Sequence, residues 1–432
     1  MASDATGDAM KLSRLIYSAF LWLLRPFLRM RLRRRARKQP EYAKHVEERF
    51  GDYSISSDKP VIWLHAVSLG ETRAAEPLVK QLLQQYSQYQ ILLTHMTPTG
   101  RAAGKELFGA KVMQCYLPYD YSYAAKKFLA HFRPVVGIVM ETEIWPNLFA
   151  ACQENKTPIM LVNARLSQES ASRYAYAKPL VAEALASLHY IAAQTEGDAH
   201  RLRELGGKNI SVCGNMKFDV SVPEEMLRRG EQLRHLFGPR PIFLAASTRD
   251  GEESQLIDNI KHFSIPNLLV VIVPRHPQRF EEIGALIEKR GINMQRRSAN
   301  ETIHSETKIV MGDSMGEMFA YYQACDVAFV GGSLLPLGGQ NIIEACAVGK
   351  PVIVGPYTFN FKDAVNNAVA CGAAVQVNDI KKLVIKANEL LSDKQRRQTM
   401  GAAGKAFCAQ HCGATARTLQ LIKKTLGERR VP

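Results

Sequence analysis

The chain has 432 residues, which is too long for one ordinary hydrophobic core and suits two α/β domains of similar size. Hydrophobic residues make up 46% and charged residues 22%, a composition that is typical of soluble globular domains and argues against a fibrous or disordered protein. The net charge is +15, but ten basic residues and no acidic one lie between Lys11 and Lys38, and so localised an excess argues against a nucleic-acid-binding protein.

Residues 10–40 combine an apolar run with a basic flank. Residues 15–24 carry no charge, and seven arginines follow from Arg25 to Arg37. A bilayer-spanning helix needs about 20 predominantly apolar residues, so this run is marginal. Two interpretations stay open: a short anchor with its basic flank on the cytoplasmic side, or an interfacial helix that lies on anionic lipid. Both predict an N-terminal membrane-associating helix.

The rest of the chain shows two series of short apolar runs that alternate with amphipathic stretches, which is the βα pattern of a parallel sheet. The runs of the first series are residues 61–66, 91–94, 135–140, 159–162 and 190–193, and those of the second are 242–246, 268–273, 308–311, 327–330 and 352–354. We therefore predict an α/β protein of the GT-B type, in which two Rossmann-like domains face each other across a cleft. The first domain covers residues 41–220, a polar linker covers 221–240, and the second domain covers 241–432.

The first candidate site residue is Glu71, in the segment HAVSLGE that follows the first run. Gly70 suits a tight turn and Ser68 a helix N-cap, so the Glu71 carboxylate is expected at the carboxyl end of a strand, where such sheets bind ligands. An acid in a first helical turn is also favoured by the helix dipole, so a purely structural role stays open.

Two further segments of this domain carry charged residues at strand ends. Glu141 and Glu143 follow the third run in METEIWPN, and one of the two is expected to bind a structural partner. Lys217, in GNMKFD, is a candidate cation at the cleft, although its spacing also fits a surface lysine.

The second domain has four polar segments that follow apolar runs, at residues 247–253, 274–277, 313–318 and 331–344. The first and third resemble capped helix starts, which can hold an anion. Arg275 offers a planar fork that matches phosphate. The paired glycines 338 and 339 let backbone N–H groups approach a ligand, and Glu344 in the next helix can accept both ribose hydroxyls. We find no D-x-D pair and no His/Glu metal spacing, so the pattern predicts nucleotide binding without a metal or other cofactor. The eight cysteines form no C-x-x-C pair, which predicts a reducing, cytoplasmic compartment.

Taken in order, these segments resemble the bacterial Kdo transferases, which add 3-deoxy-D-manno-octulosonic acid (Kdo) to a lipid A precursor. The similar segments cover almost the whole chain: HAVSLGE, THMTPTG, YLPYD, METEIWPN, NARLS, GNMKFD, PRHPQRF, GDSMGE, GGSLLPLGGQNIIEA and GPYTFNFKD. The resemblance implies a CMP-Kdo donor, lipid IVA as acceptor, and an inverting, metal-independent step of lipopolysaccharide core synthesis. It also implies a place at the cytoplasmic face of the inner membrane, in contact with anionic lipids.

The resemblance assigns roles to individual residues. It makes Glu71 the general base and links Glu141 and Lys217 to stabilisation of the transition state. It assigns contacts with CMP to Pro274, Arg275, Met315, Gly316, Glu317, Asn341, Ile342, Ile343 and Glu344. One departure is Gln340, which stands where many members have histidine and cannot carry a positive charge. Two alternatives remain: another GT-B enzyme that uses a UDP-sugar, and a non-enzymatic basic membrane-binding protein.

Overall fold

The computed structural model describes residues 2–220 and 222–428, without the side chains of residues 2–11 and 38. The chain divides into two compact units. The first unit contains the residues up to Asp219 and those from Cys412 onward, and the second contains Val220–His411.

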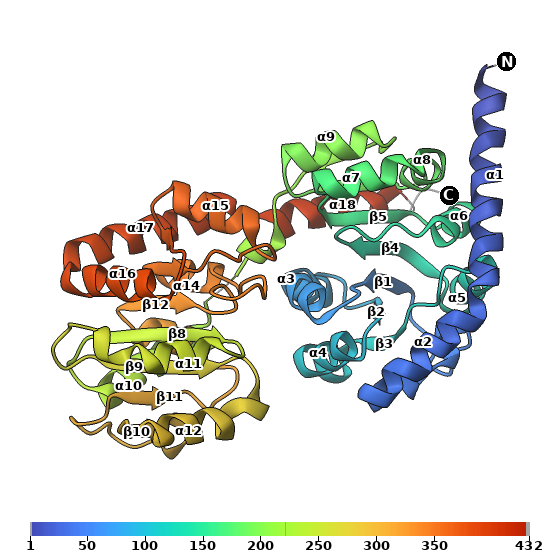
Figure 1. Ribbon diagram of the computed structural model, residues 1–432. Helices are drawn as coiled ribbons and strands as arrows, with labels where there is room; N and C mark the ends of the chain where they lie inside the picture. The colour runs from blue at the N-terminus through green and yellow to red at the C-terminus, as the bar shows by residue number, and fades with distance from the viewer. Residues whose placement is uncertain (1, 221, 429–432) are drawn as a thin grey trace. The chain divides into compact units, whose positions relative to one another are not determined.

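The first unit is built on a parallel sheet of seven strands in the order β3-β2-β1-β4-β5-β6-β7 (Figure 1). The strands are β1 (Val61–His65), β2 (Gln90–His95), β3 (Met113–Tyr116), β4 (Pro134–Met140), β5 (Ile159–Ala164), β6 (Tyr190–Ala193) and β7 (Ile210–Val212). One face packs on α3 (Leu69–Gln85), α4 (Pro98–Phe108) and α18 (Ala414–Glu428). The other packs on α5 (Ser122–Phe132), α6 (Pro146–Glu154), α8 (Lys178–Ala186) and α9 (Glu196–Glu204), with α7 (Gln168–Ala175) beside them.

The second unit repeats this architecture with the strand order β10-β11-β9-β8-β12-β13-β14 (Figure 1). Its strands are β8 (Ile242–Thr248), β9 (Leu269–Pro274), β10 (Met294–Arg296), β11 (Ile309–Met311), β12 (Val327–Val330), β13 (Val352–Val354) and β14 (Ala374–Gln376). Its helices are α10 (Glu224–Phe237), α11 (Glu252–Asp258), α12 (Phe280–Lys289), α13 (Met318–Ala324), α14 (Ile343–Val348), α15 (Lys362–Ala370), α16 (Ile380–Ser392) and α17 (Lys394–His411).

The predicted α/β architecture with two Rossmann-like sheets is confirmed. All ten apolar runs are strands, and their ends differ from the predicted ones by at most two residues. Because helices cover both faces of each sheet, the inner strands are buried on both sides and consist of continuous apolar residues. The five residues of β1, for example, are all buried.

The expected domain boundaries differ from the two units in two places. Residues 222–240 of the expected linker contribute α10, which packs against α13 in the second unit, while residue 221 lies outside the described residues. Residues from 412 onward belong to the first unit rather than the second. Asp219 accepts backbone N–H bonds from Gly413 and Thr415 at the start of α18, and Ile422 is buried in the core of the first unit.

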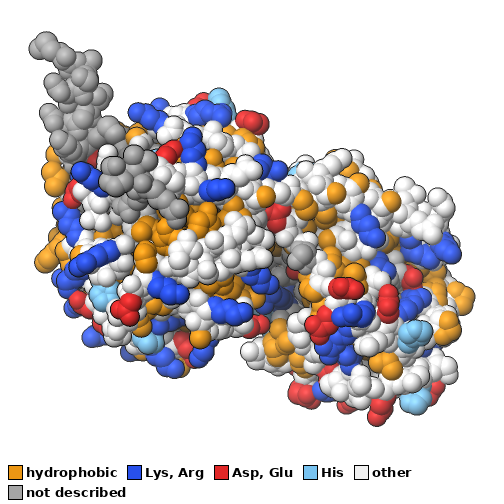
Figure 2. Space-filling view, turned by 180° about the vertical axis from the view of Figure 1, so that it is seen from behind, with side chains coloured by type: hydrophobic (Ala, Val, Ile, Leu, Met, Phe, Trp, Pro, Cys, Tyr) orange, Lys and Arg blue, Asp and Glu red, His pale blue; other side chains and the backbone are white. Residues whose placement is uncertain are grey.

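The N-terminal segment forms α1 (Ala2–Leu23) and α2 (Arg25–Lys38), which lie along the first unit (Figure 1). The Ser18 hydroxyl donates to Asn147 Oδ1 over 3.0 Å, and the Tyr121 hydroxyl donates to the carbonyl of Leu21 over 3.2 Å. Large apolar side chains on both helices are more than half exposed: Leu12, Leu15, Ile16, Phe20, Trp22, Leu23, Phe27 and Met30. Figure 2 shows hydrophobic and basic side chains interspersed over the first unit. Within the described part of the chain, none of the helices has the length and apolar character that crossing a bilayer requires.

The packing of α18 in the core of the first unit can be tested with the variant Ile422→Ala. Removing this buried side chain should lower the stability of the first unit by about 2–5 kcal/mol, because it leaves a cavity against the sheet. Urea unfolding followed by tryptophan fluorescence measures the effect, since Trp22, Trp63 and Trp145 all lie in this unit. The exposed neighbour Lys423→Ala is the control. An unchanged fluorescence midpoint for Ile422→Ala would contradict the assignment.

Candidate functional site

Glu71 lies in the first turn of α3, just after the carboxyl end of β1. Its Oε2 accepts the backbone N–H of Val67 over 2.8 Å, and its Oε1 accepts the hydroxyl of Ser68 over 3.2 Å. Ser68 has the extended backbone of an N-cap, as its position predicts, but its side chain caps no helical N–H and donates to the carboxylate instead. The local Ser-x-x-Glu pattern therefore fixes the Glu71 carboxylate at the sheet edge, in a variant of the capping box.

The surroundings of Glu71 make its carboxylate basic. Burial raises the pKa of Glu71 from 4.5 to about 8, and the negative charge of nearby Glu141 adds to the rise, while the hydrogen bond from Val67 opposes it. A carboxylate with a pKa close to neutral is suited to accept and release a proton. This property distinguishes Glu71 from an acid that only caps a helix.

Glu141 follows β4 in a left-handed backbone conformation with φ of +57°, which is costly for a residue with a side chain. Its backbone N–H donates to the Val162 carbonyl over 2.9 Å, and its Oε1 lies 3.3 Å from the Nζ of Lys217. Both side chains are about a quarter exposed, so water partly screens this ion pair. The structure thus brings three predicted residues, Glu71, Glu141 and Lys217, to one edge of the first sheet.

Glu143 is the acid of this segment that has a structural partner. Its Oε2 accepts the indole N–H of Trp145 over 3.0 Å, and burial raises its pKa. His65, at the end of β1, is also structural. It is fully buried, burial lowers its pKa to about 3, and its Nδ1 lies 2.9 Å from the hydroxyl oxygen of Thr94. His65 therefore stays neutral and is a poor candidate for a general base.

Two buried amides that the sequence did not identify as site residues hold the segment with Lys217. Asn163, at the end of β5, has φ of +52°, and its Oδ1 accepts the backbone N–H of Met216 over 3.0 Å. Gln194 in turn donates to the carbonyl of Asn163 over 2.9 Å. Asn215 accepts the N–H of Lys217 over 2.9 Å. The sequence shows Asn163 as the first residue of the NARLS segment, which follows a predicted strand. Its hydrogen-bond partner Met216 lies 53 residues away, so the sequence alone does not reveal that the two residues pair.

In the second unit, basic residues gather at the carboxyl ends of β8 and β9. Arg275 follows β9, and its backbone N–H donates to the Thr248 carbonyl over 3.0 Å. The pKa of His276 is lowered by burial and by the positive charges of Arg249, Arg275 and Arg279. Carboxylates neutralise part of this charge, because Arg279 pairs with Glu253 over 3.2 Å. The remaining field favours an anion such as phosphate at this edge.

Glu252 has a structural role that was not predicted from the amino-acid sequence. Its carboxylate is fully buried and accepts four backbone N–H groups, from Arg249, Gly332, Ser333 and Leu334, over 2.6 to 2.9 Å. The sequence predicted that the 247–253 turn could hold an anion. In the structure Glu252 itself is that anion, and it fixes the glycine-rich loop after β12.

The predicted CMP-binding residues all lie at the carboxyl edge of the second sheet: Pro274 at the end of β9 and Arg275 after it, Met315, Gly316 and Glu317 after β11, and Asn341, Ile342, Ile343 and Glu344 after β12. Three of them have limited freedom to contact a ligand through their side chains. Ile342 and Ile343 are fully buried, so only their backbone is available. Glu317 is buried and bound by Arg229 and Arg297, the latter over 3.2 Å.

Asn341 and Glu344 position each other at the start of α14. The Asn341 Nδ2 donates to Glu344 Oε1 over 3.2 Å, and the Asn341 Oδ1 accepts the N–H of Ile343 over 3.1 Å. Gln340 lies against Gly332, and Arg249 of the basic cluster lies against the same glycine. Within the described residues, no three His, Cys, Asp or Glu side chains are grouped so as to hold a metal ion.

The family model that matches the first part of the chain and two similar proteins name the same family of transferases. Residues 44–220 match the family model "3-Deoxy-D-manno-octulosonic-acid transferase (kdotransferase)", and residues 253–407 match "Glycosyl transferases group 1". The chain is 43% identical to a 3-deoxy-D-manno-octulosonic acid transferase of Bordetella pertussis, over 96% of this chain and 100% of the relative. It is 38% identical to that of Haemophilus influenzae, over 96% and 99%. The crystal structure of a glycosyltransferase from Rickettsia africae shares the fold, with a TM-score of 0.57, 15% identity, and coverage of 86% and 99%.

The raised pKa of Glu71 predicts a pH-dependent cost to folding. The folded state binds one more proton than the unfolded state between pH 4.5 and 8, so the contribution of Glu71 to stability falls as the pH rises through this window. Glu71→Gln should therefore raise the melting temperature above that of the wild type at pH above 8, and the difference should shrink toward pH 4.5. Thermal unfolding over this pH range measures it, with exposed Glu106→Gln as the control. A difference that does not depend on pH would contradict the prediction.

Glu252→Gln should destabilise the second unit by about 3 kcal/mol or more, because an amide nitrogen would face backbone N–H groups that now share a carboxylate. Urea unfolding followed by far-UV circular dichroism measures the loss. The control is Glu282→Gln, which removes an exposed carboxylate from the Arg279 cluster. Equal midpoints for the two variants would show that the buried carboxylate is dispensable.

Proposed function

The chain belongs to the 3-deoxy-D-manno-octulosonic-acid transferase family, and on that premise we propose that it transfers Kdo from CMP-Kdo to the lipid A precursor lipid IVA, with inversion at the anomeric carbon. The observation that carries the proposal is the Glu71 carboxylate, held at the edge of the first sheet with a pKa raised to about 8 beside the pair Glu141 and Lys217.

Glu71 is the general base of the proposed reaction. Its carboxylate takes the proton from a sugar hydroxyl of the acceptor while that oxygen attacks the anomeric carbon of Kdo. The new C–O bond forms as the bond to the CMP phosphate breaks, and the phosphate leaves with the electron pair. A single displacement of this kind inverts the configuration. Base catalysis of this type contributes roughly 10² to 10⁴-fold to the rate.

Glu141 and Lys217 act on the sugar in this proposal. The transition state of glycosyl transfer resembles an oxocarbenium ion, so nearby negative charge stabilises it. The distance of 3.3 Å between Lys217 Nζ and Glu141 Oε1 favours a role for Glu141 in holding this lysine. Lys217 is then oriented to bind the carboxylate of Kdo, and Asn163 and Asn215 position the backbone that carries it.

The second unit handles the donor in this proposal. Arg275, within the basic cluster after β8 and β9, stabilises the negative charge that gathers on the departing phosphate. Glu344 accepts the ribose hydroxyls, and its hydrogen bond with Asn341 orients it for that purpose. Each of these steps uses only side chains and backbone groups of this chain.

We further propose that the protein works at the cytoplasmic face of the inner membrane, where it meets its lipid acceptor. Two features of α1 and α2 support this location. Their apolar side chains, such as Trp22 and Phe27, are 61% exposed to solvent, and basic residues follow directly. An interfacial helix of this composition binds through its apolar face and through attraction to anionic lipid.

The proposed function is tested by mass-detected transfer from CMP-Kdo, generated in situ, to lipid IVA. Wild type should form product, Glu71→Gln and Glu71→Ala should lose roughly 10² to 10⁴-fold in rate while staying folded, and Glu106→Gln should keep full activity. UDP-sugars offered in place of CMP-Kdo should give no product. Absence of transfer by folded wild type would refute the donor and acceptor proposed here, and active Glu71 variants would refute the base.

A further inference from the structure

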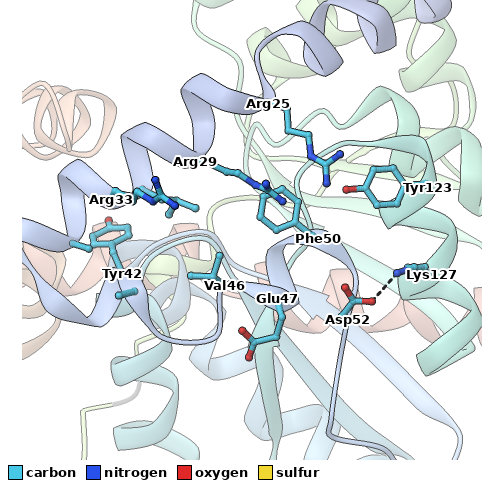
Figure 3. Close-up of a pocket in the computed structure, with 13 residues that line it drawn as sticks. Arg25, Arg29, Arg33, Tyr42, Val46, Glu47, Phe50, Asp52, Tyr123 and Lys127 are labelled. Atoms are coloured by element: carbon cyan, nitrogen blue, oxygen red, sulfur yellow. Dashed lines mark hydrogen bonds and ion pairs between the residues drawn. The ribbon is translucent and has the colours of Figure 1, made fainter.

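A cavity lies between α2 and the body of the first unit, and none of the residues proposed above for the transfer reaction lines it. It has a volume of about 620 Å³. One wall is α2, with Arg25, Arg29 and Arg33. The other walls come from the short helical segment with Phe50 and from α5 with Tyr123 (Figure 3). A cavity of this size accommodates a small-molecule headgroup.

The cavity has a surplus of positive charge. Arg25, Arg29 and Arg33 recur every four residues and so share one face of α2. Among the described side chains, none of the ion pairs includes these three arginines. Lys127 and Asp52, which also line the cavity, neutralise each other over 2.6 Å. Glu47 is then the one lining acid, within the described residues, left against three guanidinium groups.

Two donors in the wall of the cavity lack a hydrogen-bond acceptor. The Nε of Arg25 and the hydroxyl of Tyr123 are both buried and make no hydrogen bond within the described structure. Aromatic rings hold the guanidinium of Arg25 in place, with Trp22, Phe50 and Tyr123 at 5.6, 5.7 and 5.9 Å. Buried donors are nearly always satisfied in native proteins, and a bound acceptor would satisfy these two, which belong to residues that line the cavity. A phosphate oxygen fits both the charge and the donors.

The occupant is most consistent with a lipid rather than a soluble anion. Leu23 ends α1, and Phe27 lies on α2 opposite the face that carries Arg25, Arg29 and Arg33; the two apolar side chains are 75% and 61% exposed. With Leu23 and Phe27 inserted at the edge of the bilayer, α2 and its arginines lie at the depth of the headgroups. The arginines on its other side then face phosphates rather than acyl chains.

Helix α1, which leads into the cavity wall formed by α2, is hydrogen-bonded to the segment that follows Glu141. The buried carboxylate of Asp120, in the loop after β3, accepts the backbone N–H groups of Asn147 and Leu148 at the start of α6, over 3.0 and 2.8 Å. Ser18 on α1 donates to Asn147. The helix that precedes this wall of the cavity is therefore anchored at the start of α6, six residues from Glu141 in sequence.

We propose that the cavity between α2 and the first unit binds the phosphate of an anionic lipid headgroup through Arg25, Arg29, Arg33 and Tyr123. The source of that phosphate is either a membrane phospholipid or the acceptor lipid itself. The second source rests on the function proposed above, whereas the first does not. The binding test below needs no transfer activity, so its failure and the failure of the proposed function are distinguishable.

The test is flotation of the full-length protein with phosphatidylcholine vesicles, with and without phosphatidic acid. The double variant Arg29→Gln/Arg33→Gln removes two charges from the cavity, and Arg34→Gln/Arg37→Gln removes two from residues of the same helix that do not line it. If the arginines act only through diffuse electrostatic attraction, the two double variants lose the same affinity for the vesicles. The cavity predicts that the first double variant loses about tenfold more affinity for phosphatidic acid vesicles than the second.

Tyr123→Phe gives a test without a change of charge or of ring packing. It should weaken binding to phosphatidic acid vesicles several-fold and leave binding to pure phosphatidylcholine unchanged. Equal losses for the two double variants, together with an unaffected Tyr123→Phe, would overturn the proposal while leaving membrane association intact. Binding of soluble glycerol 3-phosphate as tight as that of the vesicles would also overturn it, because the occupant would then be a soluble phosphate ester.

Transfer kinetics in phospholipid-free detergent micelles separate the two sources. A raised KM for the acceptor with unchanged kcat in Arg29→Gln/Arg33→Gln identifies the acceptor phosphate as the occupant. An unchanged KM combined with weaker vesicle binding identifies a membrane phospholipid. Both results support the cavity.

Discussion

The carboxyl edge of each parallel sheet is where the chain leaves a buried strand and enters a helix, and each such turn exposes backbone N–H groups that need acceptors. In both units a glutamate in the first turn of a helix meets this need. Glu252 accepts four N–H groups and is saturated. Glu71 accepts one N–H and one hydroxyl and lies near a second carboxylate. The number of donors thus separates a structural acid from one that can take up a proton.

The inner strands of the two sheets could be predicted from the sequence, whereas the edge strands could not. The ten inner strands are buried on both faces, and their continuous apolar runs predicted them. The four strands outside the two series, β3, β7, β10 and β14, are the edge strands of the two sheets. They have three or four residues each, and β7 and β10 are only half-buried throughout. Such strands need fewer apolar residues, so the periodic signal that marks an inner strand is absent from them.

The candidate site was predictable where its residues follow strands directly, and less so where they depend on distant partners. Glu71, Glu141 and Lys217 lie together because parallel strands end at one edge. By contrast, the burial of Glu317 depends on Arg229, which belongs to a helix in what the sequence marked as a linker. The core position of Ile422 likewise reflects a return of the chain to the first unit. Pairings over such separations leave no periodic trace in one sequence.

In the proposed reaction, the charges around Glu71 link deprotonation of the acceptor to binding of the donor sugar. Glu141 raises the pKa of Glu71, and Lys217 lies within ion-pair distance of Glu141 and offsets part of its charge. In the proposed reaction the carboxylate of Kdo binds Lys217, which then offsets less of the charge on Glu141. The uncompensated charge raises the proton affinity of Glu71 further. On this reasoning Glu71 becomes a stronger base when the sugar is in place, and the donor itself helps to activate the group that deprotonates the acceptor.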